Sequence, residues 1–247
     1  MQDAKGFKKA VTIFIDILGS RDRQDFSEWY RIMDIFHNTV LNEKDYDEQH
    51  PHTLYKREIH IFSDCAYIIY DFKSGVEEGK KDVFELMTIA CYNTEKVLFE
   101  FLRNNFITRG AITYGDIYYD TERNIWFGPS MNKAFALESK EASFPRVIID
   151  PAYADELETH NAKKYEQVWF NGKILKRDSD NYLFLNYLNS FKLGIDYDKN
   201  KNLTKNILDL CEFEIQKHKN SPDELQESIK SKYNWLKKYI SDSDPLK

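Results

Sequence analysis

Two aspartates, Asp16 and Asp64, lie at the ends of apolar runs, where an unpaired carboxylate is unfavourable. Asp16 ends an apolar run that begins at Val11, and Asp64 follows Ser63 between two apolar runs within residues 58–71. A charge in an apolar strand costs several kcal/mol unless it is paired, hydrogen-bonded or bound to a metal. If the two strands are neighbours, the carboxylates converge, and a divalent cation would neutralise them. The alternative is that each aspartate only stabilises a turn.

The elements that must position these aspartates follow from hydrophobic periodicity. We expect single strands at 11–20, 106–120 and 147–149, a hairpin at 58–71, and a second hairpin at 167–188 with its turn at 178–181. We expect helices at 27–40, 81–105, 130–140 and 151–161, and a loop at 42–52. A late helix should be capped by Ser221, with Pro222 in its first turn. This order predicts an α+β fold, a ferredoxin-like βαββαβ core with an added hairpin and C-terminal helices. In that fold the end of the first strand lies beside the first hairpin turn. We expect a catalytic domain at residues 1–190 and a helical extension at 191–247.

Composition narrows the function. The chain has 247 residues, a net charge of −6, and 17 Phe, 16 Tyr and 4 Trp, so it can build a large aromatic core but lacks the surplus cations of a general nucleic-acid binder. Cys65, Cys91 and Cys211 show no paired metal-binding spacing, which argues against a disulfide framework or a zinc site. The first ten residues lack a signal-peptide core, and no run approaches a membrane span. We therefore expect a cytosolic protein with neither a nucleic-acid nor a membrane partner.

Four short motifs, in order, resemble those of the class III nucleotidyl cyclases. They are Phe14-Ile15-Asp16-Ile17-Leu18-Gly19, the hairpin carboxylate Asp64, the strand from Arg109 to Gly115, and Gly128-x-x-x-Asn132-x-Ala134. The resemblance implies that Asp16, Asp64 and the backbone carbonyl of Ile17 hold two divalent ions, Mn²⁺ or Mg²⁺. It also implies that the amides of Leu18, Gly19 and Ser20 meet a triphosphate.

The sequence departs from that family where purine cyclases read adenine. His60 and Ile125 replace the Lys and the acidic residue of the adenine-reading pair, and Ala136 stands where a transition-state Arg is usual. The chain is more similar to the bacterial Pycsar cyclases, through Phe62-Ser63-Asp64, Arg109-Gly110-Ala111-Ile112, and Leu137-Glu138 followed by Pro145-Arg146. That resemblance implies conversion of UTP to 3′,5′-cyclic UMP and pyrophosphate in antiphage defence, a head-to-tail homodimer with shared sites, and a separate effector protein for the cyclic nucleotide. CTP is the alternative substrate.

Six further side chains have two interpretations each. Arg109 is either the missing transition-state cation or a structural ion-pair partner, and Asn132 either orients the substrate or belongs to the first turn of its helix. Lys176, with Arg177, either reaches the triphosphate or lies on a solvated hairpin edge. Tyr55 and His60 either face a base pocket or pack in the core. A catalytically degenerate nucleotide sensor remains the alternative function; joining of two nucleotides, as in diguanylate cyclases, is disfavoured because the hairpin lacks a Gly-Gly-Asp/Glu-Glu-Phe turn.

Overall fold

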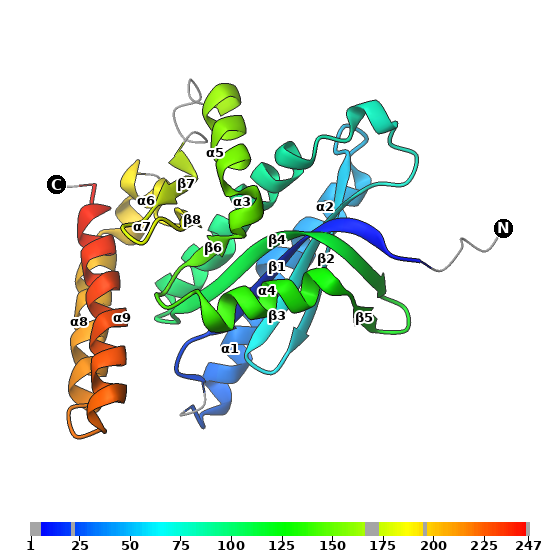
Figure 1. Cartoon of the computed structure of the whole chain (residues 1–247). Coiled ribbons are helices and arrows are strands. Elements are labelled where there is room, and N and C mark those ends of the chain that lie inside the picture. Colours follow the sequence, from blue (N-terminus) through cyan, green and yellow to red (C-terminus); the bar gives the residue numbers. More distant parts are fainter. Residues whose placement is uncertain (1–5, 21–22, 166–172, 195–196, 246–247) are drawn as a thin grey trace.

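The computed structural model describes residues 6–20, 23–165, 173–194 and 197–245. Its strands are β1 (Lys8–Ile17), β2 (Tyr55–Phe62), β3 (Cys65–Phe72), β4 (Thr108–Asp120), β5 (Ile125–Phe127), β6 (Val147–Ile149), β7 (Leu175–Arg177) and β8 (Leu183–Leu185). Its α-helices are α1 (Phe26–Phe36), α2 (Asn42–Gln49), α3 (Val83–Arg103), α4 (Pro129–Lys140), α5 (Pro151–Tyr165), α6 (Asn189–Lys192), α7 (Tyr197–Asn200), α8 (Leu203–Lys217) and α9 (Asp223–Asp242). Figure 1 shows the sheet at the centre, with the α8–α9 pair standing to one side, far from β5.

One sheet runs through the described chain in the order β2-β3-β1-β4-β6-β8-β7, and β5 pairs with the far end of β4. β1 is antiparallel to both β3 and β4, and Asp16 lies opposite Cys65 on one side and Arg109 on the other. The hairpin turn between β2 and β3 is therefore next to the end of β1. This confirms the neighbour relation that convergence of Asp16 and Asp64 requires.

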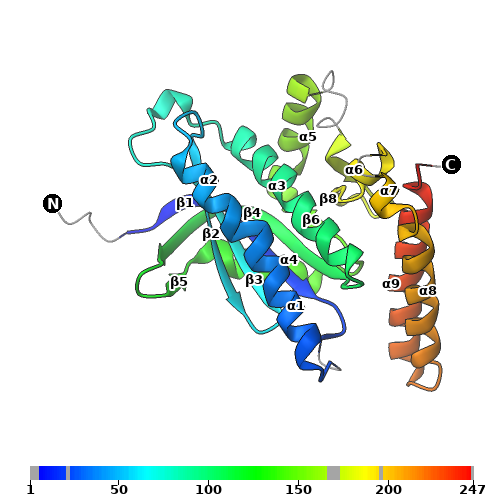
Figure 2. The same cartoon turned by 180° about the vertical axis from the view of Figure 1, so that it is seen from behind.

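The two faces of the sheet are covered by different helices (Figures 1 and 2). Val11, Ile13 and Ile15 belong to the large core formed with α1 and α3, whereas Ala10 and Phe14 belong to a smaller core completed by α4. Because side chains alternate along a strand, Asp16 shares the α4 face with Phe14. The carboxylate thus lies on the face that has the thinner cover.

Residues 42–52 correct the sequence prediction of a loop. Asn42–Gln49 is a helix, α2, which directly continues a π-helical stretch at His37–Leu41. Its side chains pair with β2, since Lys44 Nζ lies 2.7 Å from Glu58 Oε2 and the carboxylate of Asp47 pairs with Arg57. A helix held by ion pairs carries no apolar stripe, so hydrophobic periodicity could not reveal it.

The C-terminal half contains the predicted second hairpin and helices. β7 and β8 pair antiparallel, and the Asn181 N–H donates to Asp178 O at 3.0 Å across the predicted turn. Residues 166–172, where the first arm was expected to begin, lie outside the described residues. The prediction that Ser221 caps the late helix is wrong, because α9 begins at Asp223 after Pro222 and has no side-chain cap.

The α8–α9 pair packs against the same core as the sheet, to which it contributes Leu203, Ile207, Cys211, Leu236, Tyr239 and Ile240. The division into domains at residue 190 stays a prediction. Among the described residues, no helix combines the length and the apolar character needed to span a bilayer.

Candidate active site

The end of β1 and the β2–β3 turn are joined at the residues that carry the two carboxylates. The N–H of Ile17 donates to the backbone oxygen of Asp64 at 3.1 Å, and the buried Ser20 hydroxyl donates to the Asp64 carboxylate. Gly19 makes the intervening turn with φ of +73°, a conformation that glycine adopts without strain. Local hydrogen bonding therefore fixes Asp64 against the segment that follows Asp16.

Arg109 joins this site from β4. Its Nε lies 3.5 Å from Asp16 Oδ2 and 2.5 Å from Oε1 of Glu138, a buried residue of α4. Burial raises the pKa of Glu138 to about 7; the Arg109 guanidinium opposes this rise, and the Asp16 carboxylate adds to it. Arg109 is thus engaged as an ion-pair partner, which is one of the two roles expected for it.

The donors at this end of the sheet suit a hard divalent cation. Carboxylate and carbonyl oxygens are the ligands that Mg²⁺ and Mn²⁺ prefer, and Asp16, Asp64 and the Ile17 carbonyl are of that type. Burial and the neighbouring Asp64 and Asp16 carboxylates raise the pKa of the Cys65 thiol to about 12, so it is not a thiolate ligand. No cluster of three or more His, Cys, Asp or Glu side chains suited to a metal occurs in the described ranges. A cation here would need backbone, water or substrate oxygens to complete its shell.

An open cleft of about 890 Å³ lies over these residues. One wall contains Asp16, Ile17, Leu18, Gly19, Ser20, Asp64 and Arg109. The opposite wall comes from the α8–α9 pair, through Phe213, Glu214, Lys217, His218, Leu225, Ile229, Lys232 and Tyr233. The C-terminal helices therefore form part of the site.

The expected phosphate-binding turn is only partly available. The Leu18 N–H donates to Ile107 O at 2.8 Å, so it is used within the fold and is not offered to a ligand. Gly19 and Ser20 line the cleft beside Asp16.

Four other predicted residues are not among those that line this cleft in the described chain. Lys176 Nζ lies 5.4 Å from the centre of the Tyr239 ring, and Tyr55, at the far end of β2 from Asp64, accepts a 3.5 Å hydrogen bond from Asn93. His60 stacks on Trp126 with ring centroids 5.3 Å apart. Asn132 lines a different pocket on the α4 face, together with Tyr67, Trp126, Phe127 and Met131.

Sequence reasoning missed Glu138 and Lys232 as members of the site. In the sequence Glu138 stands out only through the resemblance to the Pycsar cyclases, although a carboxylate on the apolar side of a helix itself indicates a buried partner. Lys232 gave no local signal, because it lies on a polar helix whose place over the cleft is a tertiary feature.

Comparison with known proteins leaves the function open. No protein-family model matches the chain, and no curated protein matches it. Among solved structures the chain is similar to the guanylyl cyclase Cya2, with 12% sequence identity and a TM-score of 0.42 over 62% of this chain and 81% of that one. The function therefore has to be argued from the residues of the site.

Proposed function

We propose that the protein is a pyrimidine nucleotide cyclase that converts UTP to 3′,5′-cyclic UMP and pyrophosphate. The observation that carries the proposal is the juxtaposition of Asp16 and Asp64, joined through the Ile17 N–H, on one wall of an open cleft. In the reaction the ribose 3′ oxygen forms a bond to the α-phosphorus, the bond from that phosphorus to the bridging oxygen breaks, and pyrophosphate and the hydroxyl proton leave.

Asp16, Asp64 and the Ile17 carbonyl would hold the divalent ions. Such ions lower the pKa of an attacking hydroxyl and neutralise charge on phosphate oxygens. The chain itself contributes position: Ser20 and Ile17 fix Asp64, and Arg109 contacts Asp16. We assign the first four strands and their helices to the ferredoxin-like arrangement on the strand order β2-β3-β1-β4.

The choice of a pyrimidine rests on what replaces the adenine-reading pair. His60 is stacked on Trp126, and Ile125 is an apolar residue of β5, so neither position offers the charged group that reads adenine. The resemblance to Pycsar cyclases favours UTP, with CTP as the alternative. A cyclic product would be sensed by a separate effector protein, as that resemblance implies for antiphage defence.

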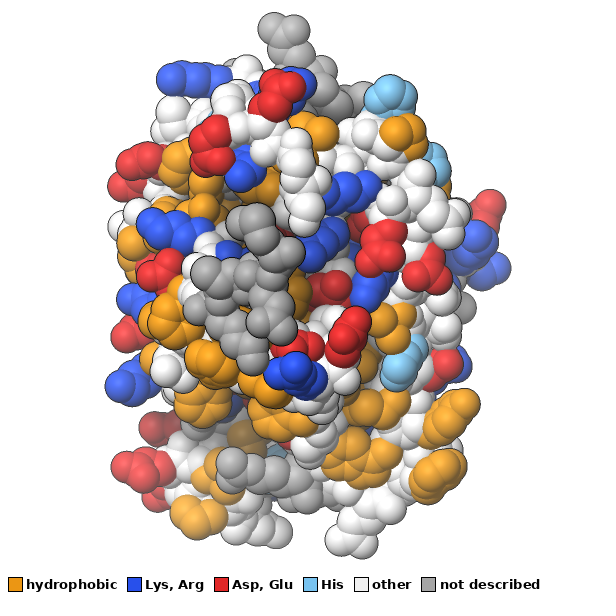
Figure 3. All heavy atoms as spheres, turned by 90° about the vertical axis from the view of Figure 1, so that its right-hand side faces the viewer, with side chains coloured by type: hydrophobic (Ala, Val, Ile, Leu, Met, Phe, Trp, Pro, Cys, Tyr) orange, Lys and Arg blue, Asp and Glu red, His pale blue; other side chains and the backbone are white. Residues whose placement is uncertain are grey.

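We further propose that two copies pair head to tail. Asn132 lies in the α4-face pocket and not in the cleft of Asp16 and Asp64, an arrangement that suits a residue acting at the partner's site. Phe62, Phe127 and Phe135 are each about half exposed. Figure 3 shows hydrophobic side chains gathered on the left and lower parts of the side that carries β5. Mixing an Asp16→Ala chain with an Asn132→Ala chain should restore activity that neither has alone; no restoration would contradict shared sites.

The test of the proposed function is incubation of the purified chain with Mn²⁺ and each of the four nucleoside triphosphates, followed by chromatographic separation of products. We expect one pyrimidine triphosphate to yield a cyclic monophosphate and pyrophosphate. Asp16→Ala and Asp64→Ala should each abolish turnover, and Asp209→Ala is the matched control because Asp209 is an exposed α8 residue paired only with Lys205 among the described residues. Turnover of ATP alone, or of nothing, refutes the substrate assignment.

A nucleotide sensor without turnover is the second candidate, favoured by one observation. Arg109 is bound to Glu138, and Ala136 offers no replacement cation from α4. A sensor would bind UTP with Mn²⁺ in calorimetry and form no product in the assay above.

A further inference from the structure

The cleft contains several cations, and most of them already have carboxylate partners. Arg109 pairs with Glu138 and Asp16, and Arg23 pairs with Glu28 at 3.0 Å. On the α8 side, Lys217 and His218 both lie within 4 Å of Glu214. The charges of Arg109, Arg23 and Lys217 are therefore at least partly neutralised before any substrate arrives.

Lys232 of α9 is different. It lines the same cleft as Asp16 and Asp64, it is half-buried, and it makes no ion pair with any residue that the structure describes. Burial lowers the pKa of Lys232, the charge of Arg109 lowers it further, and the Glu138 carboxylate opposes both. Arg109 and Lys232 also line a second, smaller pocket together, so Lys232 lies beside the Arg109–Glu138 pair without forming an ion pair with either residue.

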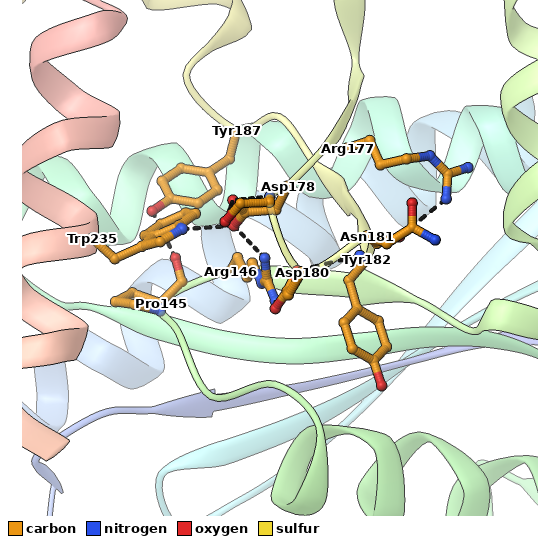
Figure 4. A network of polar contacts seen from close by, with 10 residues as sticks. Pro145, Arg146, Arg177, Asp178, Asp180, Asn181, Tyr182, Tyr187 and Trp235 are labelled. Carbon is orange, nitrogen blue, oxygen red and sulfur yellow. Dashed lines mark hydrogen bonds and ion pairs between the residues drawn. The ribbon is translucent and has the colours of Figure 1, made fainter.

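The part of α9 that follows Lys232 is anchored by contacts about one and two turns further along the helix. Trp235 Nε1 donates to Asp178 Oδ2 at 2.6 Å, and the fully buried guanidinium of Arg146 pairs with both Asp178 and Asp180 (Figure 4). The Tyr239 hydroxyl donates to Asn186 Oδ1 at 2.7 Å. α9 is thereby anchored to the β7–β8 turn and to the segment before β6, so the helix that carries Lys232 is a fixed part of the cleft wall.

We propose that Lys232 binds the triphosphate of the nucleotide and supplies, from the C-terminal helix of the same chain, the positive charge that α4 lacks at Ala136. The proposal rests on the proposed function, because it needs a nucleoside triphosphate in this cleft. An ammonium group in contact with non-bridging phosphate oxygens stabilises both the bound substrate and the charge that develops on departing pyrophosphate. It also gives the C-terminal helices a direct part in the chemistry.

The test compares Lys232→Met with Lys232→Arg, and with Lys230→Met as the matched control. Lys230 is an exposed residue of the same helix, and its Nζ contacts Gln226 Oε1 at 2.8 Å. Binding of UMP, UDP and α,β-methylene-UTP in the presence of Mg²⁺ is measured by calorimetry on the full chain; the analogue stands in for UTP because its α–β bridge cannot break. The kcat and KM values are measured with Mn²⁺ and UTP. Thermal unfolding of each variant checks that it is folded.

We expect Lys232→Met to weaken UTP binding about 10- to 100-fold, the range for loss of one hydrogen bond to a charged group, and to leave UMP binding nearly unchanged. Lys232→Arg should recover most of the loss, and Lys230→Met should bind all three nucleotides like the parent chain. If Lys232 had only a structural role, its replacement by Met would weaken the binding of all three nucleotides by the same factor. Equal UTP affinity and equal kcat/KM in Lys232→Met and the parent chain overturn the proposal and leave the cyclase assignment standing.

The two hypotheses fail in different ways. If the parent chain binds UTP and forms no product, the cyclase assignment fails, and the dependence of affinity on phosphate number still tests Lys232. If the parent chain binds none of the three nucleotides, both hypotheses are overturned.

Discussion

Arg146 provides the sharpest stability prediction, because its guanidinium is fully buried and carries a charge. It pairs with Asp178 and Asp180, and it lies within about 6 Å of the ring centres of Phe144, Tyr182, Phe184 and Trp235. Burial alone would raise the pKa of Asp178, but hydrogen bonds from the Ser179 N–H and Trp235, together with the charge of Arg146, lower it overall. The negative charges of Asp178 and Asp180 are thus compensated only while the Arg146 guanidinium is present.

We predict that Arg146→Met lowers the free energy of unfolding by about 3–5 kcal/mol, the usual cost of removing one partner of a buried ion pair. Methionine preserves much of the packing, so the loss reports mainly on the uncompensated carboxylates. Most of the cost should come from Asp178, whose side chain is 16% exposed, and less from Asp180, which is 35% exposed. Because whole domains are stable by only about 5–15 kcal/mol, the effect should be large in a urea titration followed by tryptophan fluorescence.

The control is the triple variant Arg146→Met, Asp178→Asn, Asp180→Asn. Its asparagine oxygens still accept hydrogen bonds, including the one from Trp235, and no unpaired charge remains. We expect it to regain about 2 kcal/mol or more relative to Arg146→Met, because neutral replacement of a buried ion pair is often tolerated. A loss below about 1 kcal/mol in Arg146→Met, or no recovery in the triple variant, would refute this reasoning.

Two further predictions concern the strands and the helix around the carboxylates. Gly110→Ala should lower the free energy of unfolding by about 3 kcal/mol or more, because a Cβ at Gly110 would lie 2.1 Å from the Phe14 backbone oxygen. In the same urea titration Gly115→Ala should lower it far less, because its Cβ would lie 3.5 Å from Ser130. Burial raises the pKa of Glu138 from 4.5 to about 7, so between these pH values the folded state binds more protons than the unfolded state. The free energy of unfolding should therefore fall as pH rises from about 4.5 to 7, by up to about 3 kcal/mol. Unfolding titrations in EDTA should show this slope in the parent chain and a smaller one in Glu138→Gln, and identical pH profiles would count against the raised pKa.

β1 and the first hairpin were predicted because residues 11–15 and the two runs around Ser63-Asp64 are rich in apolar residues with high strand preference. The order of strands and helices then placed the end of β1 beside the hairpin turn, and the pairing of β1 with β3 confirms this. The backbone contact between Ile17 and Asp64 is a direct consequence of that strand order.

What the sequence did not predict depends on tertiary contacts. Tyr55 precedes the turn by eight residues, and seven strand steps of 3.4 Å put it roughly 24 Å from Phe62. Its closeness to Asp64 in the sequence therefore does not place it near Asp64 in space. Lys176 matched a family pattern and does not line the cleft, whereas Lys232, one of several basic residues that do, reaches it through the packing of α9. The pairing of Arg109 with Glu138 likewise needs α4 to lie across β4, which no local pattern encodes.

The proposed function requires that Asp16 and Asp64 bind the same divalent cations. Titration of Mn²⁺ into the chain with bound α,β-methylene-UTP, whose α–β bridge cannot break, followed by electron paramagnetic resonance of free Mn²⁺, measures this directly. We predict that Asp16→Asn and Asp64→Asn each weaken Mn²⁺ binding at least about 10-fold, a loss of roughly 1.4 kcal/mol, whereas the exposed Asp209→Asn does not. Unchanged Mn²⁺ affinity in either site variant would contradict the account.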